Sequence, residues 1–152
     1  MYYLAYGSNL NMGQMKYRCP TAKYEGTAIL EGWELLYKGS KTGAYLTIER
    51  AEGGEVPVGI WKVGKADLAA LDRYEGYPEF YYRADVKITP VSEVNGRKMR
   101  AFIYIMHEDR PCGLPSMSYI RICEQGYKDF GFDTKFLDLA YDRTMRRVAY
   151  ES

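Results

Sequence analysis

Cysteine and histidine are scarce in this chain of 152 residues. The three cysteines, Cys19, Cys112 and Cys123, are odd in number and far apart, so they match neither a disulfide framework nor the spacing of zinc ligands. Because His107 is the only histidine, neither a two-histidine metal site nor a zinc site with three histidines can form. A Ser-His-Asp triad would also need His107, and the sequence has no Gly-x-Ser-x-Gly turn to present a serine. These scarcities exclude the commonest metal and serine-nucleophile chemistries and favour a reducing cytoplasm.

Long apolar runs and an excess of either charge are also missing. No stretch approaches the ~20 apolar residues needed to cross a bilayer, and the first six residues have neither the basic leader nor the apolar core of a secretory signal. Lys and Arg total 21 against 20 Asp and Glu, whereas proteins that wrap nucleic acid phosphates usually carry a stronger basic bias. We therefore expect a cytoplasmic monomer or homodimer that has neither a membrane nor a nucleic acid as partner.

Tyrosine is abundant, with 16 residues of this type. A tyrosine side chain combines a large apolar ring with a polar tip, which suits the wall of a wet cavity or an interface. Tyrosine-rich sheets can also stack nucleic acid bases, but without a basic surface to hold the phosphates this alternative ranks lower. The length and the hydrophobic share of 47% predict one domain over residues 1–152 with a substantial core.

Alternating apolar residues, glycines and caps predict the order of the elements. Strands are expected over Tyr2–Tyr6, Ala28–Tyr37, Ala44–Glu49, Val56–Val63, Tyr81–Thr89 and Met99–Met106. Helices are expected over Met12–Arg18, with Asn9 or Asn11 as the cap, and over Ala66–Tyr74. A third helix is expected after a Ser116 cap, with the stripe Ile120, Cys123, Tyr127 and Phe130, and a fourth over Lys135–Tyr150, with the stripe Leu137, Tyr141, Met145 and Val148. Gly53-Gly54 is expected to separate two strands, and Asn95-Gly96 to turn a hairpin. This order favours an α+β fold, a curled sheet or barrel with helices outside, over a doubly wound parallel sheet.

The loop Tyr6–Leu10 is the first candidate site. Glycine lets the chain turn sharply off the first strand, so that successive N–H groups face outward just ahead of a helix. Such groups make a pocket for a carboxylate or a phosphate. An ordinary turn in which Ser8 or Asn9 caps the helix explains the same residues equally well. No Gly-Lys-Ser or Gly-Lys-Thr follows, so the loop is not a P-loop.

Glu75 is the second candidate. It falls in the last turn of its predicted helix, where the negative end of the dipole disfavours an ionised carboxylate. Aromatic residues that would partly desolvate it surround it in sequence: Tyr74, Tyr77, Phe80, Tyr81 and Tyr82. Both effects would raise its pKa, and a carboxyl group that titrates near neutrality can both take and give protons. The local sequence by itself is more typical of a surface glutamate beside a glycine cap.

Taken together, these motifs resemble the γ-glutamylcyclotransferase family, which includes the AIG2-like proteins. The matching segments occur in the family's order across most of the chain: Tyr3–Leu10, Met15, Arg18-Cys19-Pro20, Gly43–Ile48, Val58–Trp61, Leu71-Asp72-x-x-Glu75-Gly76, Pro115-Ser116-x-x-Tyr119, Gly126 and Gly131. Tyr-Gly-Ser-Asn followed about 65 residues later by Glu-Gly is fairly specific, whereas neither motif is specific alone.

The resemblance implies a small curled mixed β-barrel, flanked by helices, with a cavity at one end. It implies that the γ-glutamyl head group of a small substrate is held by backbone groups of Tyr3, Leu4, Ala5, Tyr6, Gly7, Ser8 and Asn9. Glu75 would be the general acid and base, Tyr119 would contact the substrate, and neither a cofactor nor a metal is implied. The implied reaction cyclises a γ-glutamyl amide or γ-glutamyl amino acid to 5-oxoproline and a free amine. A module of the same fold that binds an amino-acid-like ligand without turning it over is the alternative.

Overall fold

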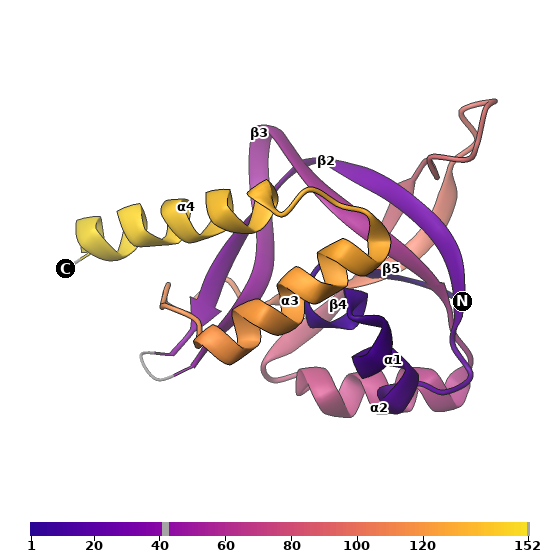
Figure 1. Ribbon diagram of the computed structural model, residues 1–152, viewed down its shortest axis with the longest axis horizontal. Coiled ribbons are helices and arrows are strands. Elements are labelled where there is room, and N and C mark those ends of the chain that lie inside the picture. Colours follow the sequence, from indigo (N-terminus) through magenta and orange to yellow (C-terminus); the bar gives the residue numbers. More distant parts are fainter. Residues whose placement is uncertain (41–42, 152) are drawn as a thin grey trace.

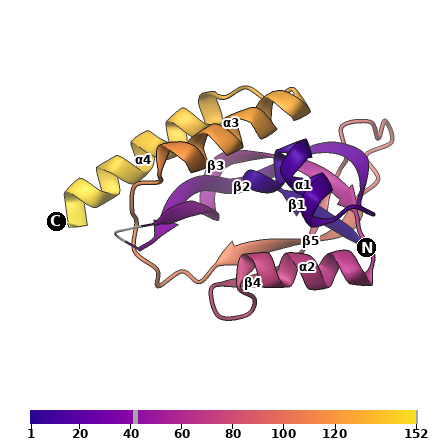
Figure 2. The same ribbon diagram turned by 60° about the horizontal axis from the view of Figure 1, so that its bottom comes forward.

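The computed structural model describes residues 1–40 and 43–151, which form a curled sheet flanked by helices (Figure 1). The strands are β1 (Tyr2–Ala5), β2 (Lys23–Gly39), β3 (Ala44–Lys62), β4 (Tyr81–Ile88) and β5 (Met99–Met106). The helices are a 3-10 turn η1 (Ser8–Leu10), α1 (Met12–Arg18), α2 (Lys65–Glu75), α3 (Met117–Phe130) and α4 (Lys135–Glu151). Figure 2 shows α3 and α4 on one side of the sheet and α2 on the other. The predicted α+β class is confirmed.

The short strand β1 lies at the centre of the mixed sheet, whose order is β2-β3-β1-β5-β4. It runs antiparallel to β3, with Tyr3 opposite Trp61, and parallel to β5, with Tyr3 opposite Phe102. At the two edges, Ala28 of β2 forms an isolated bridge with Pro90, just beyond β4. This bridge brings the edges together at one point, so the described sheet is curled towards a barrel without closing into one.

The prediction of two strands, Ala44–Glu49 and Val56–Val63, is wrong, because β3 continues through Gly53-Gly54. The pairing of β2 with β3 shifts register between Glu31 and Trp33, at Gly32. Gly32 and Gly53 both have positive φ, 83° and 76°, which glycine adopts without steric cost. The shift absorbs the extra residues of β3, and the two strands pair again beyond it.

The hairpin of β4 and β5 is confirmed, with Ile88 opposite Met99. The predicted turn at Asn95-Gly96 lies inside a longer connection, residues 89–98, in which Gly96 has a φ of 69°. A hairpin therefore forms, but the two-residue turn does not set its register.

The buried face of α4 differs from the predicted stripe. Met145, expected inside, is 43% exposed, whereas Leu137, Ala140 and Thr144 are the buried residues of the helix. The Thr144 hydroxyl accepts a hydrogen bond from the N–H of Tyr37 on β2 (2.9 Å), so a polar side chain anchors the helix to the sheet. None of the described helices is long and apolar enough to span a membrane.

Candidate active site

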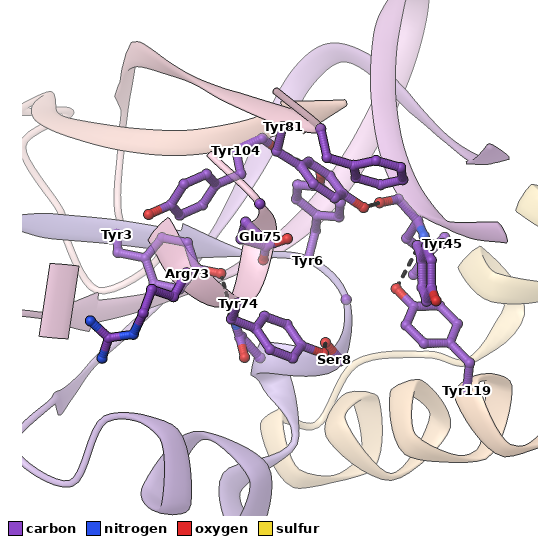
Figure 3. A pocket seen from close by; sticks show the side chains of 15 residues that line it. Tyr3, Tyr6, Ser8, Tyr45, Arg73, Tyr74, Glu75, Tyr81, Tyr104 and Tyr119 are labelled. Carbon is purple, nitrogen blue, oxygen red and sulfur yellow. Dashed lines mark hydrogen bonds between the residues drawn. The ribbon is translucent and has the colours of Figure 1, made fainter. Parts of the chain in front are cut away.

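A cavity of about 440 Å³ opens where β1 ends, next to the C-terminal end of α2. This volume is within the range of small-molecule sites. Figure 3 shows its lining: Tyr3, Tyr6, Gly7, Ser8, Asn9, Tyr45, Leu46, Arg73, Tyr74, Glu75, Gly76, Phe80, Tyr81, Tyr104 and Tyr119. Two of the predicted site residues, Leu4 and Ala5, are not among them and are almost fully buried. The structure therefore brings the loop, Glu75 and Tyr119 to one cavity from three distant parts of the sequence.

The loop that follows β1 makes one wall of the cavity. A Cβ atom at Gly7 would lie 3.3 Å from the hydroxyl oxygen of Tyr119, so glycine permits the close approach of α3. Within residues 1–40 and 43–151, no hydrogen bond is found to the backbone N–H groups of Gly7, Ser8 and Asn9. Asn11, not Ser8 or Asn9, caps α1 by accepting a hydrogen bond from the N–H of Gln14 (3.0 Å). The side chains of Ser8 and Asn9 thus do not cap the helix, and three residues with unpaired backbone donors line the cavity.

The side chains of the loop are fixed by hydrogen bonds. The Ser8 hydroxyl pairs with the Tyr74 hydroxyl at 2.9 Å. The Asn9 amide donates to the hydroxyl of Tyr3 (2.9 Å) and accepts from the guanidinium of Arg18. The Arg18 guanidinium also lies over the ring of Tyr74, 3.3 Å from its centroid. These contacts connect the loop, α1 and the end of α2 around the cavity.

Glu75 is the last residue of α2, and Gly76 ends the helix in the left-handed conformation at a φ of 63°. Its side chain is partly buried and points among the tyrosine rings of the cavity (Figure 3). Burial raises the pKa of the Glu75 carboxyl to about 8, and the positive charge of Arg18 offsets only part of this effect. Among the described residues, no hydrogen bond to this carboxyl is found. Glu75 thus lies beside a glycine cap, as expected, and also lines the cavity, and burial is the largest cause of the shift in its pKa.

Tyr119 reaches the cavity from the first turn of α3. Ser116 caps this helix, as predicted, by accepting a hydrogen bond from the N–H of Tyr119 (3.2 Å). The Tyr119 hydroxyl accepts a hydrogen bond from the N–H of Leu46 on β3 (3.0 Å). Burial raises the pKa of Tyr119 well above its ordinary value.

Sequence reasoning identified part of the aromatic wall, in which seven tyrosines line the cavity. Tyr3, Tyr6 and Tyr119 were expected to contact the substrate and Tyr74 and Tyr81 to desolvate Glu75, whereas Tyr45 and Tyr104 were not singled out. The hydroxyl of Tyr81 donates to the carbonyl of Leu46 (2.7 Å), and that of Tyr104 donates to the Asp72 carboxylate (2.6 Å). The abundance of tyrosine indicated a wet cavity, but only the pairing of the strands identifies which tyrosines line it. In the described part of the chain, no group of three His, Cys, Asp or Glu side chains is placed to hold a metal ion.

Comparison with known proteins finds consistent similarities. The profile of the family described as "Gamma-glutamyl cyclotransferase, AIG2-like" matches residues 3–121. The γ-glutamylcyclotransferase of Bos taurus is 32% identical over 155 residues, which cover 96% of this chain and 77% of the bovine protein. The γ-glutamylcyclotransferase of Homo sapiens is 32% identical over 156 residues, with the same coverage of 96% and 77%. A solved structure of a γ-glutamyl cyclotransferase superposes with a TM-score of 0.76 at 29% identity, over 92% of this chain and 85% of that one.

Proposed function

The chain belongs to the γ-glutamyl cyclotransferase, AIG2-like family, and from this premise we propose that it cyclises the γ-glutamyl group of a small γ-glutamyl amide or γ-glutamyl amino acid. The products are 5-oxoproline and a free amine. One observation carries the proposal: a carboxyl group with a raised pKa, Glu75, lines the same cavity as the loop with unpaired amides and as Tyr119. The cavity is closed enough to desolvate that carboxyl and large enough for a small substrate.

The reaction needs a folded substrate more than it needs a strong nucleophile. The α-amine of the γ-glutamyl group attacks its own γ-carbonyl carbon, a C–N bond closes a five-membered ring, and the original amide C–N bond breaks. Orientation of two groups already joined in one molecule can contribute ~7–11 kcal/mol to such a step. The rigid loop, held by the hydrogen bonds of Ser8 and Asn9, is suited to hold the substrate in the folded conformation.

In this proposal Glu75 moves the protons. The α-amine is protonated at neutral pH and cannot attack until a base removes its proton. The Glu75 carboxylate takes one proton from the α-ammonium and then donates it to the departing nitrogen, so one group serves as base and as acid. The attacking nitrogen loses a second proton when it becomes the ring N–H, and this proton passes to the released amine, which is protonated at neutral pH. A pKa of about 8 matches the task, because both forms of the carboxyl are populated near neutral pH. Each such transfer is worth ~10²–10⁴-fold in rate.

The loop and Tyr119 supply hydrogen-bond donors. The unpaired amides of Gly7, Ser8 and Asn9 are suited to the α-carboxylate of the head group or to the oxyanion that develops on the γ-carbonyl. Leu4 and Ala5 are paired with β3 within the sheet, so we propose that they act by fixing the position of this loop. Tyr119, next to Gly7, contacts the substrate through its hydroxyl.

The decisive experiment measures 5-oxoproline after incubation with γ-glutamyl dipeptides, γ-glutamyl-lysine and glutathione. Glu75→Gln should abolish turnover while substrate binding, followed by calorimetry, stays within a few-fold of the original. Glu79→Gln, at an exposed position four residues along the chain, is the matched control and should keep full activity. Full activity of the Glu75→Gln protein would remove this residue from the mechanism. Tight binding of γ-glutamyl compounds without any product would instead favour the non-catalytic binding module.

We further propose that residues 1–152 act as one domain. One hydrophobic cluster contains buried side chains from all five strands and from the helices of the described chain, among them Met15 of α1, Leu71 of α2, Tyr127 of α3 and Leu137 of α4. Limited proteolysis should therefore leave a single protected fragment, and sedimentation will decide between a monomer and a homodimer.

A further inference from the structure

The cavity has a closed interior and an exposed rim. Four tyrosines of the interior, Tyr3, Tyr6, Tyr81 and Tyr104, are at most 7% exposed, whereas Tyr45 and Tyr74 are 44% and 45% exposed. In the reaction proposed above, the γ-glutamyl head group must reach the Glu75 carboxyl among these buried rings. The part of the substrate that leaves as the amine must therefore lie outward, between the side chains of the rim.

The rim is built from aromatic rings. Tyr45 packs edge-on against Phe80 (6.2 Å between ring centroids) and against Tyr119 (5.2 Å). Figure 3 shows Tyr45 and Tyr119 on one side of Glu75, with Tyr74 closer to Ser8. Exposed, rigid aromatic rings at the mouth of a cavity offer a large apolar contact area to a flat or bulky apolar group.

The charges around the rim disfavour a cationic leaving amine. Aromatic faces attract cations, but an arginine already covers two of these rings. Arg18 lies over Tyr74 at 3.3 Å and Arg110 lies over Phe80 at 4.5 Å. The only charged residues among the described lining are Arg73 and Glu75, and Glu75 is used by the reaction. An ammonium group on the leaving amine would thus meet Arg73 and, apart from Glu75, no carboxylate in the described lining, whereas a neutral or carboxylate-bearing amine would not be repelled.

We infer that the preferred substrates are γ-glutamyl amides whose leaving amine carries an aromatic or large apolar group and no positively charged side chain, seated against Tyr45 at the rim. This inference rests on the proposed cyclotransferase activity and narrows it to one class of amine. It assigns to Tyr45 a specificity-determining role at the outer end of the cavity.

Two matched pairs of substrates test the inference on the unmodified protein. The comparison of kcat/KM for γ-glutamyl-phenylalanine with kcat/KM for γ-glutamyl-alanine measures how much the aromatic group contributes. γ-Glutamyl-norleucine against γ-glutamyl-lysine, with lysine joined through its α-amine, differs only by the side-chain ammonium. We expect kcat/KM to be about tenfold higher for the first member of each pair, in line with the free energy of aromatic contacts and apolar pockets. Equal kcat/KM values, or a preference for lysine, would overturn the inference.

Variants then locate the preference. Tyr45→Ala should bring the phenylalanine-to-alanine ratio of kcat/KM close to one, and Tyr45→Phe should retain it. Tyr17→Ala is the control, because Tyr17 is 91% exposed on α1 and does not line the cavity. If Tyr45→Ala folds and its phenylalanine-to-alanine ratio of kcat/KM is unchanged, Tyr45 does not determine the specificity. If this variant does not fold, the kcat/KM ratios of the two substrate pairs on the unmodified protein decide the inference. Formation of 5-oxoproline from none of the four substrates would overturn the proposed activity itself, and product at equal rates would overturn the substrate preference alone.

Discussion

Replacing Glu75 with glutamine should change how the stability of the protein depends on pH. Burial raises the pKa of this carboxyl from an ordinary value of 4.5 to about 8. The folded protein therefore binds the proton more tightly than the unfolded chain does. The stabilisation that the proton provides is complete below about pH 4.5 and is lost as the pH rises towards 8. The glutamine side chain has the same shape and does not ionise, so the variant lacks this loss.

The size of the effect follows from the shift in pKa. One unit of pKa corresponds to about 1.4 kcal/mol, so the full shift sets a ceiling of about 5 kcal/mol on the free energy of unfolding. Glu75 is only partly buried, and solvent reaching it through the mouth of the cavity screens the charge. We therefore expect the unmodified protein to lose about 2 kcal/mol relative to Glu75→Gln between pH 5 and pH 9. In a domain of this length the loss amounts to about 4–8 °C in Tm.

Urea unfolding followed by tryptophan fluorescence at pH 5, 7 and 9 measures this difference. The quantity to compare is the free energy of unfolding of Glu75→Gln minus that of the unmodified protein, and it should grow as the pH rises. Glu79→Gln removes one negative charge at an exposed position and controls for the change in net charge. A constant difference between pH 5 and pH 9 would refute the reasoning, because it would mean that the carboxyl has the same proton affinity in the folded and unfolded states.

Three further variants test the surroundings of the cavity. Gly7→Ala places a methyl group about 3.3 Å from the Tyr119 hydroxyl, so kcat/KM should fall at least tenfold while Tm stays nearly unchanged. In a double-mutant cycle, Gly7→Ala should lower kcat/KM less when Tyr119→Phe has already removed that oxygen. Because Arg18 lowers the pKa of Glu75, Arg18→Gln should move the rising limb of kcat/KM against pH to higher pH, and an unmoved limb would exclude this coupling. Gly126→Ala places a methyl group 2.6 Å from the backbone at the start of α1, so urea unfolding should show a loss of about 1–3 kcal/mol, whereas undiminished stability would mean that α3 shifts freely.

Those parts of the fold that depend on local chemistry could be predicted from the sequence. Gly76 ends α2 and Ser116 begins α3 where they were expected, because caps and left-handed glycines act over a few neighbouring residues. Gly53-Gly54 was misinterpreted, because a pair of glycines breaks a strand or forms a bulge depending on what the partner strand offers. The partner strand here is β2, whose pairing with β3 shifts register between Glu31 and Trp33, and the pairing of distant strands is not a local property.

In the candidate site, too, the residues that belong to local sequence motifs could be predicted and the others could not. Glu75 and the loop that contains Gly7 belong to such motifs, and residues next to them in sequence form part of their surroundings. Tyr104 belongs to no motif, and it reaches the cavity through the pairing of β5 with β1 and β4. Arg18, which contacts Asn9 and the ring of Tyr74, is placed there by the packing of α1 against the loop.

The central strand β1 pairs only with strands from much later in the chain, so the protein can become active only late in folding. Its four residues, Tyr2–Ala5, gain partners only after the chain has supplied Trp61 for one edge and Phe102 for the other. Contacts between residues so remote in sequence require the closure of long loops and form slowly. The cavity at its end also needs Tyr119, from still later in the chain. A nascent or truncated chain that ends before α3 should therefore be inactive. During refolding, activity should be recovered only when the whole sheet has formed.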